Sequence, residues 1–217
     1  MHSLARAVAL MVSGCALLTC NDAVMKALTE SIPLGEAVFI RSVFCIVPIT
    51  ILIVRADGFA TLRVHRWGGQ LLRAGLLAFS TVCFLSSLAY LPLAEATSLA
   101  YASPIILTVL APWLLGEKVS AREWVAVVMG FTGVLIMLEP NGGELRVHVL
   151  LPLGAAVSEA LRDVVTRRLT ATETSESMMA MSVAVVGLLA LTTVGGWRVP
   201  TGLELGWLAV AGLFLGL

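Results

Sequence analysis

Long apolar blocks separated by short polar segments dominate the chain. A transmembrane helix needs about 20 consecutive, mostly apolar residues. The sequence offers eight such blocks, which cover residues 4–28, 33–54, 71–91, 94–115, 122–138, 147–168, 177–197 and 205–217. Short connections that contain Pro, Gly and Asn separate most of them. The pattern predicts an all-α, polytopic membrane helical bundle in which consecutive helices run antiparallel.

The composition agrees with a protein whose solvent is lipid. The chain is 59% hydrophobic and 13% charged, whereas a soluble domain is about half apolar and about a quarter charged. A formal net charge of +0 without any run of like charges argues against a nucleic-acid partner. The four cysteines lie in apolar stretches without metal-ligand spacing, so no metal site is expected.

Basic residues in the connections indicate how the bundle is oriented. Cytoplasmic loops collect Lys and Arg, and an N-terminus in the cytoplasm places nine loop basic residues on the inner side and two on the outer side. The inner nine are Arg6, Arg55, Arg63, Arg66, Arg73, Lys118, Arg122, Arg167 and Arg168, and the outer two are Arg146 and Arg198. We therefore expect a multi-pass protein of the inner membrane with a cytoplasmic N-terminus.

A weak internal repeat relates the first helix to the sixth. Asp22 and Lys26 match Asp163 and Arg167 in spacing, and the segment at 74–77 resembles that at 211–214. Five helices per repeat is an odd number, so the second copy is inverted, as in many secondary transporters. The expected domains are residues 1–140 and a partial second repeat at 147–217, with three of five helices. Because the eighth apolar run stops at residue 217, the sequence is expected to be truncated there.

The segment from residue 86 to 140 carries the most distinctive motifs. It reads SSLAYLPLAEATSLAYASPIILTVLAPWLLGEKVSAREWVAVVMGFTGVLIMLEP. The motif residues, in chain order, are Leu88, Tyr90, Pro104, Leu115-Gly116-Glu117, Gly130 and Gly133. With the first hairpin, NDAVMKALTESIPLGEAVFIRSVF, the chain resembles the ten-helix EamA-type transporters of the drug/metabolite transporter superfamily. The resemblance implies export or uptake of a small metabolite, no cofactor, and cytoplasmic termini.

Two other function classes stay open beside a transporter. A membrane-embedded enzyme that acts on lipid-linked groups is one, although the only histidines are His2, His65 and His148 and neither a phosphate-binding loop nor a nucleophile elbow is present. A non-transporting membrane scaffold is the other, and a homodimer is a further open alternative. We expect a secondary transporter, and not an enzyme, that works by alternating access between the two five-helix halves.

Ionisable residues inside the spans are the candidate functional residues, because such a group costs about 3 kcal/mol unless it faces a partner or water. Arg41 lies deep in the second span and suits a carboxylate or phosphate of a substrate. The alternative is a structural ion pair with Glu36 or Asp22. Asn21 and Asp22 in the first span are candidates for the wall of a substrate cavity, although Asp22 and Lys26 could instead neutralise each other.

Two further sites follow from the later spans. Glu159, together with Arg162 and Asp163, forms a polar patch in the sixth span, and a buried carboxylate there could bind substrate or couple transport to protons. Otherwise Glu159 forms a salt bridge with Arg162. Glu36 is a second candidate for proton coupling. Tyr101 shares its span with Pro104 and is a candidate for stacking on a substrate, although aromatics at helix ends are commonly interfacial anchors.

Overall fold

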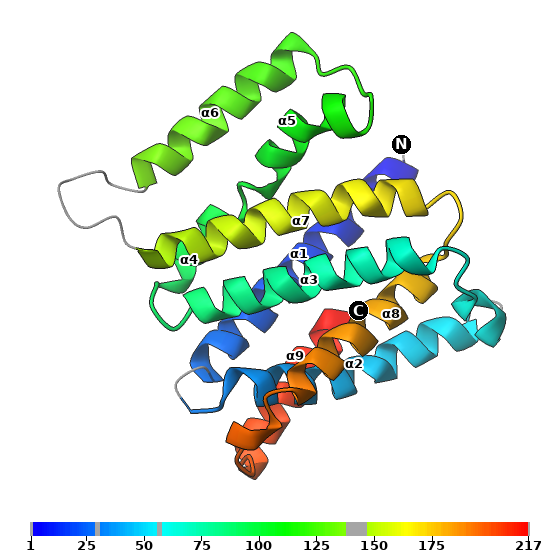
Figure 1. Ribbon diagram of the computed structural model, residues 1–217, viewed down its shortest axis with the longest axis vertical. Helices are drawn as coiled ribbons and strands as arrows, with labels where there is room; N and C mark the ends of the chain where they lie inside the picture. Colours follow the sequence, from blue (N-terminus) through cyan, green and yellow to red (C-terminus); the bar gives the residue numbers. More distant parts are fainter. Residues whose placement is uncertain (1, 29–30, 56–57, 138–146, 217) are drawn as a thin grey trace. The chain divides into compact units, whose positions relative to one another are not determined.

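The computed structural model describes residues 2–28, 31–55, 58–137 and 147–216, and every regular element within these ranges is helical. The connection at 138–146, which contains the predicted helix stop at 139–143 and Arg146, lies outside the described residues. Figure 1 shows the helices. They are α1 (His2–Leu28), α2 (Leu34–Arg55), α3 (Trp67–Ser87), α4 (Leu93–Ala100), α5 (Ser103–Leu114), α6 (Ala121–Met137), α7 (Leu150–Leu169), α8 (Ser175–Leu191) and α9 (Gly202–Gly216), with short 3₁₀ turns at Gly58–Leu62, Val147–Val149 and Val194–Gly196.

Each predicted span corresponds to helix, with one interruption. The fourth span, expected to be continuous over 94–115, is divided into α4 and α5 by Tyr101 and Ala102. Proline lacks an N–H, and its ring clashes with the carbonyl four residues earlier. Pro104 therefore disfavours a helix that continues through Ala100, where α4 ends, but fits the first turn of α5. Among the described helices, three segments are long and apolar enough to cross a membrane: Leu34–Arg55, Trp67–Ser87 and Leu93–Leu114.

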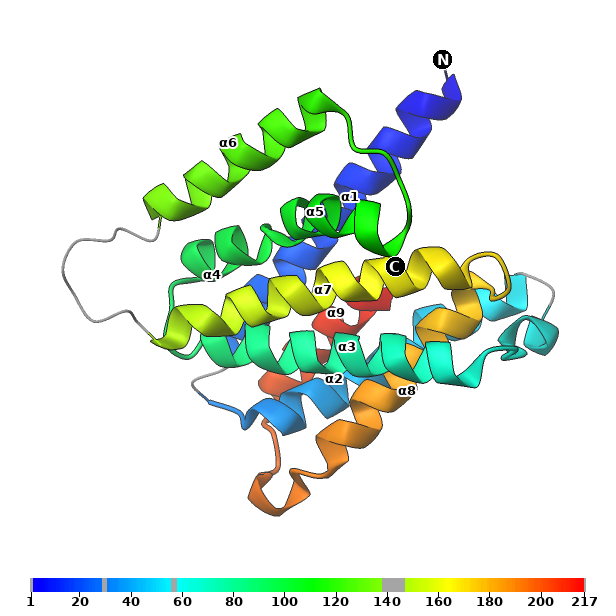
Figure 2. The same ribbon diagram turned by 45° about the horizontal axis from the view of Figure 1, so that its top comes forward.

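The chain folds into two compact units. Unit 1 combines Met1–Arg63 with Thr174–Leu217, and unit 2 is Val64–Glu173. In unit 1, α2 packs against α8 and α9, and α1 packs against α9. In unit 2, α7 packs against α3, α4 and α5, while α6 lies against α5. Figures 1 and 2 both show α3 and α7 side by side.

The packed pairs agree with the alternation expected of membrane spans. Along α3 and α7, Gly69 lies opposite Leu169, whereas Cys83 lies opposite Gly154, so these helices are antiparallel. Helices α2 and α9 are parallel, because residue numbers increase in the same direction along both: Gly212 lies against the backbone of Arg41, and Gly216 lies against Pro48. In a chain that crosses the membrane repeatedly, two spans whose ordinal numbers differ by an odd number should be antiparallel, and two whose numbers differ by an even number should be parallel. Helices α3 and α7, the third and sixth spans, are antiparallel as expected. Helices α2 and α9, the second and eighth spans, are parallel as expected.

Several helix ends have recognisable capping chemistry. The Thr174 side chain accepts the N–H of Ser177 at the start of α8. Before α6, Ser120 and Glu123 bind each other's backbone N–H groups, which is a capping box. Gly116 follows α5 at a φ of 69°, the left-handed conformation in which a residue without a Cβ is favoured. The Gly of the Leu-Gly-Glu motif thus turns the chain at the end of this helix.

Candidate functional site

Among the residues of unit 1 whose burial is described, Arg41 is the most deeply buried cation. It is 5% exposed, and its Nη1 lies 3.5 Å from Oδ1 of Asn21, which is the outer limit of hydrogen-bond distance. Its Nε has no hydrogen-bond partner among the described residues. Asn21, which is also buried, donates from Nδ2 to Asp22 at 3.1 Å. The α1–α2 contact therefore brings together three of the predicted site residues and leaves part of the guanidinium available to an anion.

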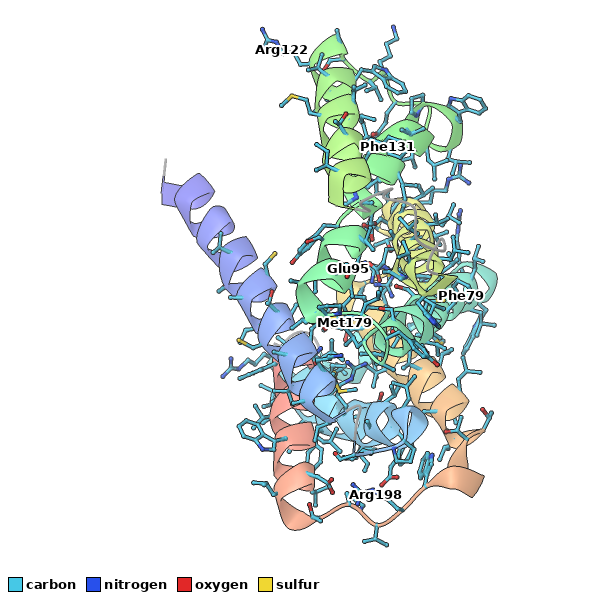
Figure 3. All side chains as sticks on the ribbon, turned by 90° about the vertical axis from the view of Figure 1, so that its left-hand side faces the viewer. Phe79, Glu95, Arg122, Phe131, Met179 and Arg198 are labelled. Carbon is cyan, nitrogen blue, oxygen red and sulfur yellow. The ribbon has the colours of Figure 1, made fainter. Side chains whose placement is uncertain are left out.

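Glu36 binds the backbone of unit 1 and forms no ion pair with Arg41. The side chain is 1% exposed, and its Oε2 accepts the N–H of Arg198 at 2.9 Å. Arg198, which Figure 3 labels on the segment leading into α9, donates in turn to the carbonyl of Ser31 and to Glu204. Oε1 of Glu36 has no hydrogen-bond partner in the described part of the chain. The predicted alternative of an ion pair between Arg41 and Glu36 is thus not what the structure shows.

Gly212 allows α9 to approach the backbone of Arg41 closely. A Cβ at this position would lie 2.5 Å from the carbonyl oxygen of Arg41 and 2.7 Å from Cβ of Phe44. Gly216, one turn later, meets Cys45 and the ring of Pro48 in the same way. Small residues four positions apart are the usual device for close packing between membrane helices. The α2–α9 contact therefore holds the backbone around Arg41 in place.

Glu159 is the centre of a hydrogen-bonded cluster in unit 2, and both of its oxygens have a partner. Its Oε1 accepts the hydroxyl of Ser80 at 3.0 Å, and its Oε2 lies 2.7 Å from Nη2 of Arg162. The same Nη2 is 3.0 Å from Oδ1 of Asp163. The salt bridge between Glu159 and Arg162 that the sequence offered as an alternative role is therefore present. These side chains are part-buried, so they are not sealed from a ligand.

Further polar contacts continue along α7 toward its C-terminus. Nε of Arg73 donates to Oγ1 of Thr166 at 2.9 Å. Arg167 forms a salt bridge with Glu117 at 3.0 Å, and Arg168 donates to the carbonyl of Leu114 at the end of α5. The Glu of the Leu-Gly-Glu motif thus anchors the end of α5 to the basic end of α7.

Glu173 fastens the start of α3. Its Oε1 accepts the N–H groups of His65 and Arg66 at 2.9 and 2.6 Å, and its Oε2 accepts Nε2 of Gln70 at 3.1 Å. Burial by itself raises the pKa of this carboxyl, but the hydrogen bonds from Gln70, Arg66 and His65 together outweigh burial and lower it. Helix starts leave N–H groups without partners within the helix. Glu173 binds two N–H groups just before α3 from more than a hundred residues away in the sequence.

The remaining predicted residues lie apart from these clusters. Tyr101 caps α4 and is 65% exposed, on the outer surface of unit 2. Asp22 and Lys26 are both part-buried on α1. Sequence reasoning missed the roles of Glu173 and Glu36, because nothing in either local segment reveals the backbone that each carboxylate binds. It singled out Gly212 only as part of a repeat.

No group of three His, Cys, Asp or Glu side chains within the described residues is arranged to hold a metal ion. The four cysteines are free thiols: Cys45 is buried, Cys83 is part-buried, and Cys15 and Cys20 are exposed on α1. The main buried polar groups of the described chain are thus the two clusters around Arg41 and Glu159 and the two backbone-binding glutamates.

Comparison with known proteins identifies similar sequences and similar folds. The EamA-like transporter family matches residues 5–139. The S-adenosylmethionine uptake transporter of Rickettsia felis is 28% identical over 88% of this chain and 65% of its own length. The riboflavin transporter of Rhizobium johnstonii is 32% identical over 72% of this chain and 52% of its own length. This chain thus spans between half and two thirds of these relatives.

A solved crystal structure has the same fold as this chain. It superposes with a TM-score of 0.69 and covers 94% of this chain and 75% of the other, at 24% sequence identity. Because 94% of this chain is covered, the likeness in fold extends beyond residue 139.

Proposed function

Because the chain belongs to the EamA-like transporter family, we propose that the full-length protein is a secondary transporter that carries a small metabolite across the inner membrane by alternating access. The observation that carries the proposal is the environment of Arg41, a buried cation in an apolar helix with an Nε that lacks a partner among the described residues. A charged side chain inside a span costs about 3 kcal/mol unless it faces a partner or water. A substrate that supplies the missing partner explains its presence.

The substrate proposed on this basis bears a carboxylate or a phosphate. A guanidinium presents its donors in a planar fork that matches these anions in two-point hydrogen bonds. Asn21 and Asp22 adjoin Arg41 and are proposed to contact the rest of the molecule. S-adenosylmethionine, named for the relative from Rickettsia felis, carries an amino-acid carboxylate, whereas riboflavin, named for another relative, carries no acid. We therefore choose S-adenosylmethionine as the first probe. Contacts of Tyr101 and Glu159 with substrate stay predictions.

Proton coupling, if transport uses it, is proposed to involve Glu36 before Glu159. A proton on Oε1 of Glu36 would break no hydrogen bond among the described residues, since that oxygen has no partner there. Both oxygens of Glu159 are occupied, one by Ser80 and the other by Arg162. Protonation of Glu159 would weaken its charge-assisted bond to Arg162.

The inverted repeat is supported by the pairing of the helices. The proposed repeat exchanges α1 with α7 and α3 with α9, since these are the first and sixth, and the third and eighth, spans. Within unit 2 α3 packs on α7, and within unit 1 α9 packs on α1. Each of these pairs is the image of the other under the repeat. We also propose a cytoplasmic N-terminus, which the distribution of basic residues among the connections supports.

Uptake by the purified full-length protein in proteoliposomes tests the function. Radiolabelled S-adenosylmethionine should enter vesicles that contain the protein and should not enter empty vesicles, and an imposed pH gradient should change the rate if protons are coupled. Unlabelled riboflavin in excess tests whether the site also accepts a molecule without an acid group. Uptake equal to that of empty vesicles for both compounds, in either direction and with or without a pH gradient, would argue against a carrier of this substrate class.

A further inference from the structure

The two compact units do not coincide with the two predicted repeats. Unit 1 contains α1 and α2 from residues 1–140 and α8 and α9 from residues 147–217. Unit 2 contains α3 to α6 from the first range and α7 from the second. Each unit is therefore built from helices of both repeats. If two parts of the molecule move against each other as rigid bodies, these parts are either the repeats or the units, because the two divisions group the helices differently.

In unit 2, hydrogen bonds join the repeats over the middle of the contact between α3 and α7. The hydroxyl of Ser158 donates to the carbonyl of Leu76 at 2.8 Å, Ser80 binds Glu159, and Arg73 binds Thr166. Beyond the end of α7, Glu173 holds the backbone that leads into α3. Sliding α3 along α7 would break these bonds, and inside the membrane there is no water to replace them.

In unit 1, close backbone packing joins the repeats. Gly212 lies so close to α2 that an added Cβ would overlap Arg41 and Phe44, and separation of α2 from α9 would lose this close packing. Gly187 of α8 lies against Ser42 of α2. Glu36 of α2 also binds the N–H of Arg198, just before α9.

The two backbone-binding glutamates occupy related places in the chain. Glu36 lies two residues into α2, the second span of the first repeat, and binds the segment before α9, the third span of the second. Glu173 lies two residues before α8, the second span of the second repeat, and binds the segment before α3, the third span of the first. The acids are not at equal offsets from Asp22 and Asp163, so the correspondence is one of topology rather than of register. Each acid fastens one repeat to the other inside a single unit.

We propose that units 1 and 2 are the bodies that stay intact during transport, and that the two sequence repeats are not. Rigid-body movement of one bundle against another is the usual route of alternating access. The inference rests on the proposed transport function, and it specifies which helices keep their contacts while access changes. In this scheme α3 keeps its contact with α7, and α2 keeps its contacts with α8 and α9, throughout the cycle.

Disulfide crosslinks between the repeats test the proposal, and the chain offers one position pair in each unit. In unit 1, a Cβ at Gly187 would lie 3.6 Å from Cβ of Ser42, within the usual disulfide range of about 3.5–4.5 Å. The pair is Ser42→Cys with Gly187→Cys. In unit 2, a Cβ at Gly154 would lie 3.9 Å from the sulfur of the native Cys83 and meets nothing else. Gly154→Cys alone creates this pair.

Both crosslinks are made in the full-length protein with the cysteines outside each pair replaced by alanine. After oxidation in proteoliposomes, and confirmation of the disulfide by mass spectrometry, uptake of radiolabelled S-adenosylmethionine should stay within about twofold of the same sample after reduction. The crosslink should also form with equal yield in the presence and absence of substrate. Controls are each single cysteine and, for the second pair, Gly154→Cys with Cys83→Ala, which should be indifferent to oxidation.

Uptake that stops on oxidation of either pair and returns on reduction would overturn the proposal, because it would show that α2 and α8, or α3 and α7, must separate. So would a crosslink that fails to form, or whose yield depends on substrate. Absence of uptake in the unmodified protein would count against the proposed function instead, and the substrate-independent yield of each crosslink would still decide whether the contacts persist.

Discussion

The α2–α9 contact of unit 1 brings backbone close to backbone, whereas the α3–α7 contact of unit 2 is joined by hydrogen bonds that side chains make. Gly212 lets α9 approach the backbone of Arg41 closely. Nε of the Arg41 guanidinium has no hydrogen-bond partner among the described residues. In unit 2 the carboxylate of Glu159 has a partner at each oxygen, Ser80 and Arg162. Both contacts cross the predicted repeats, but Nε of the buried Arg41 has no partner among the described residues, whereas both oxygens of Glu159 have one.

This difference separates residues that maintain the fold from residues that are free to bind something else. A buried polar group with unused capacity is costly, so its presence favours a function. A completed network mainly stabilises the structure. This difference supports the proposal that Arg41 recognises substrate and that the Glu159–Arg162 pair chiefly stabilises the packing of unit 2.

Replacing Arg41 should have the largest effect on transport. Hydrogen bonds to charged groups contribute about 1.5–3 kcal/mol, so Arg41→Ala should reduce uptake of S-adenosylmethionine by about tenfold or more. Arg41→Lys keeps the charge but loses the planar fork and should raise KM. Arg122→Ala is the matched control, since Arg122 is exposed at the start of α6 and points away from it in Figure 3. Normal uptake per mole of inserted Arg41→Ala protein would make Arg41 a structural residue.

Filling the space at Gly212 should have the largest effect on stability. The Cβ of Gly212→Ala would meet the carbonyl oxygen of Arg41 at 2.5 Å, and overpacking of this kind costs about 1–3 kcal/mol. We expect a lower Tm in detergent. Gly206→Ala in the same helix meets nothing within 4 Å and should leave Tm unchanged. Equal Tm values for the two variants would show that the close backbone contact at Gly212 does not contribute to the stability of unit 1.

Breaking the cluster of unit 2 should cost stability more than transport. Arg162→Ala would leave Glu159 and Asp163 without their shared cation, at a cost of about 1–3 kcal/mol. Adding Glu159→Ala should recover part of the loss, because the carboxylate left without its cation is removed as well. A double-mutant cycle on Tm measures this coupling. If Glu159→Ala lost transport without any change in Tm, Glu159 would bind substrate or protons rather than stabilise the packing.

The smallest expected effect concerns pH and Glu173. The hydrogen bonds to this carboxylate lower its pKa in the folded state, so the unfolded chain binds more protons below about pH 5. The stabilisation is therefore present above the unfolded pKa of about 4.3 and is lost as pH falls through the lower folded value. Glu173→Gln should show a shallower fall in Tm on acidification than the unchanged protein. Identical pH profiles would show that the Glu173 bonds do not contribute to stability.

Much of the fold follows from the sequence because lipid imposes simple rules. Spans must be long, apolar and helical, so the apolar blocks locate the helices, and Pro104 accounts for the one that is interrupted. The family follows from the motifs around Leu115-Gly116-Glu117, and Arg41 was identifiable as a charge in an apolar block. The salt bridge of Glu159 with Arg162 was foreseeable from their spacing of three residues on one helix.

Only the tertiary structure decided which helices form each unit and what the buried acids bind. Glu36 and Glu173 bind backbone N–H groups that lie 162 and more than 100 residues away, and an N–H looks the same at every position of a sequence. Gly212 is distinguished from Gly206 only by the backbone of Arg41 opposite to it. The sequence determined where charge enters the membrane, because hydropathy is a local property. Packing determined which of those charges are satisfied, because partners are chosen by distance in space.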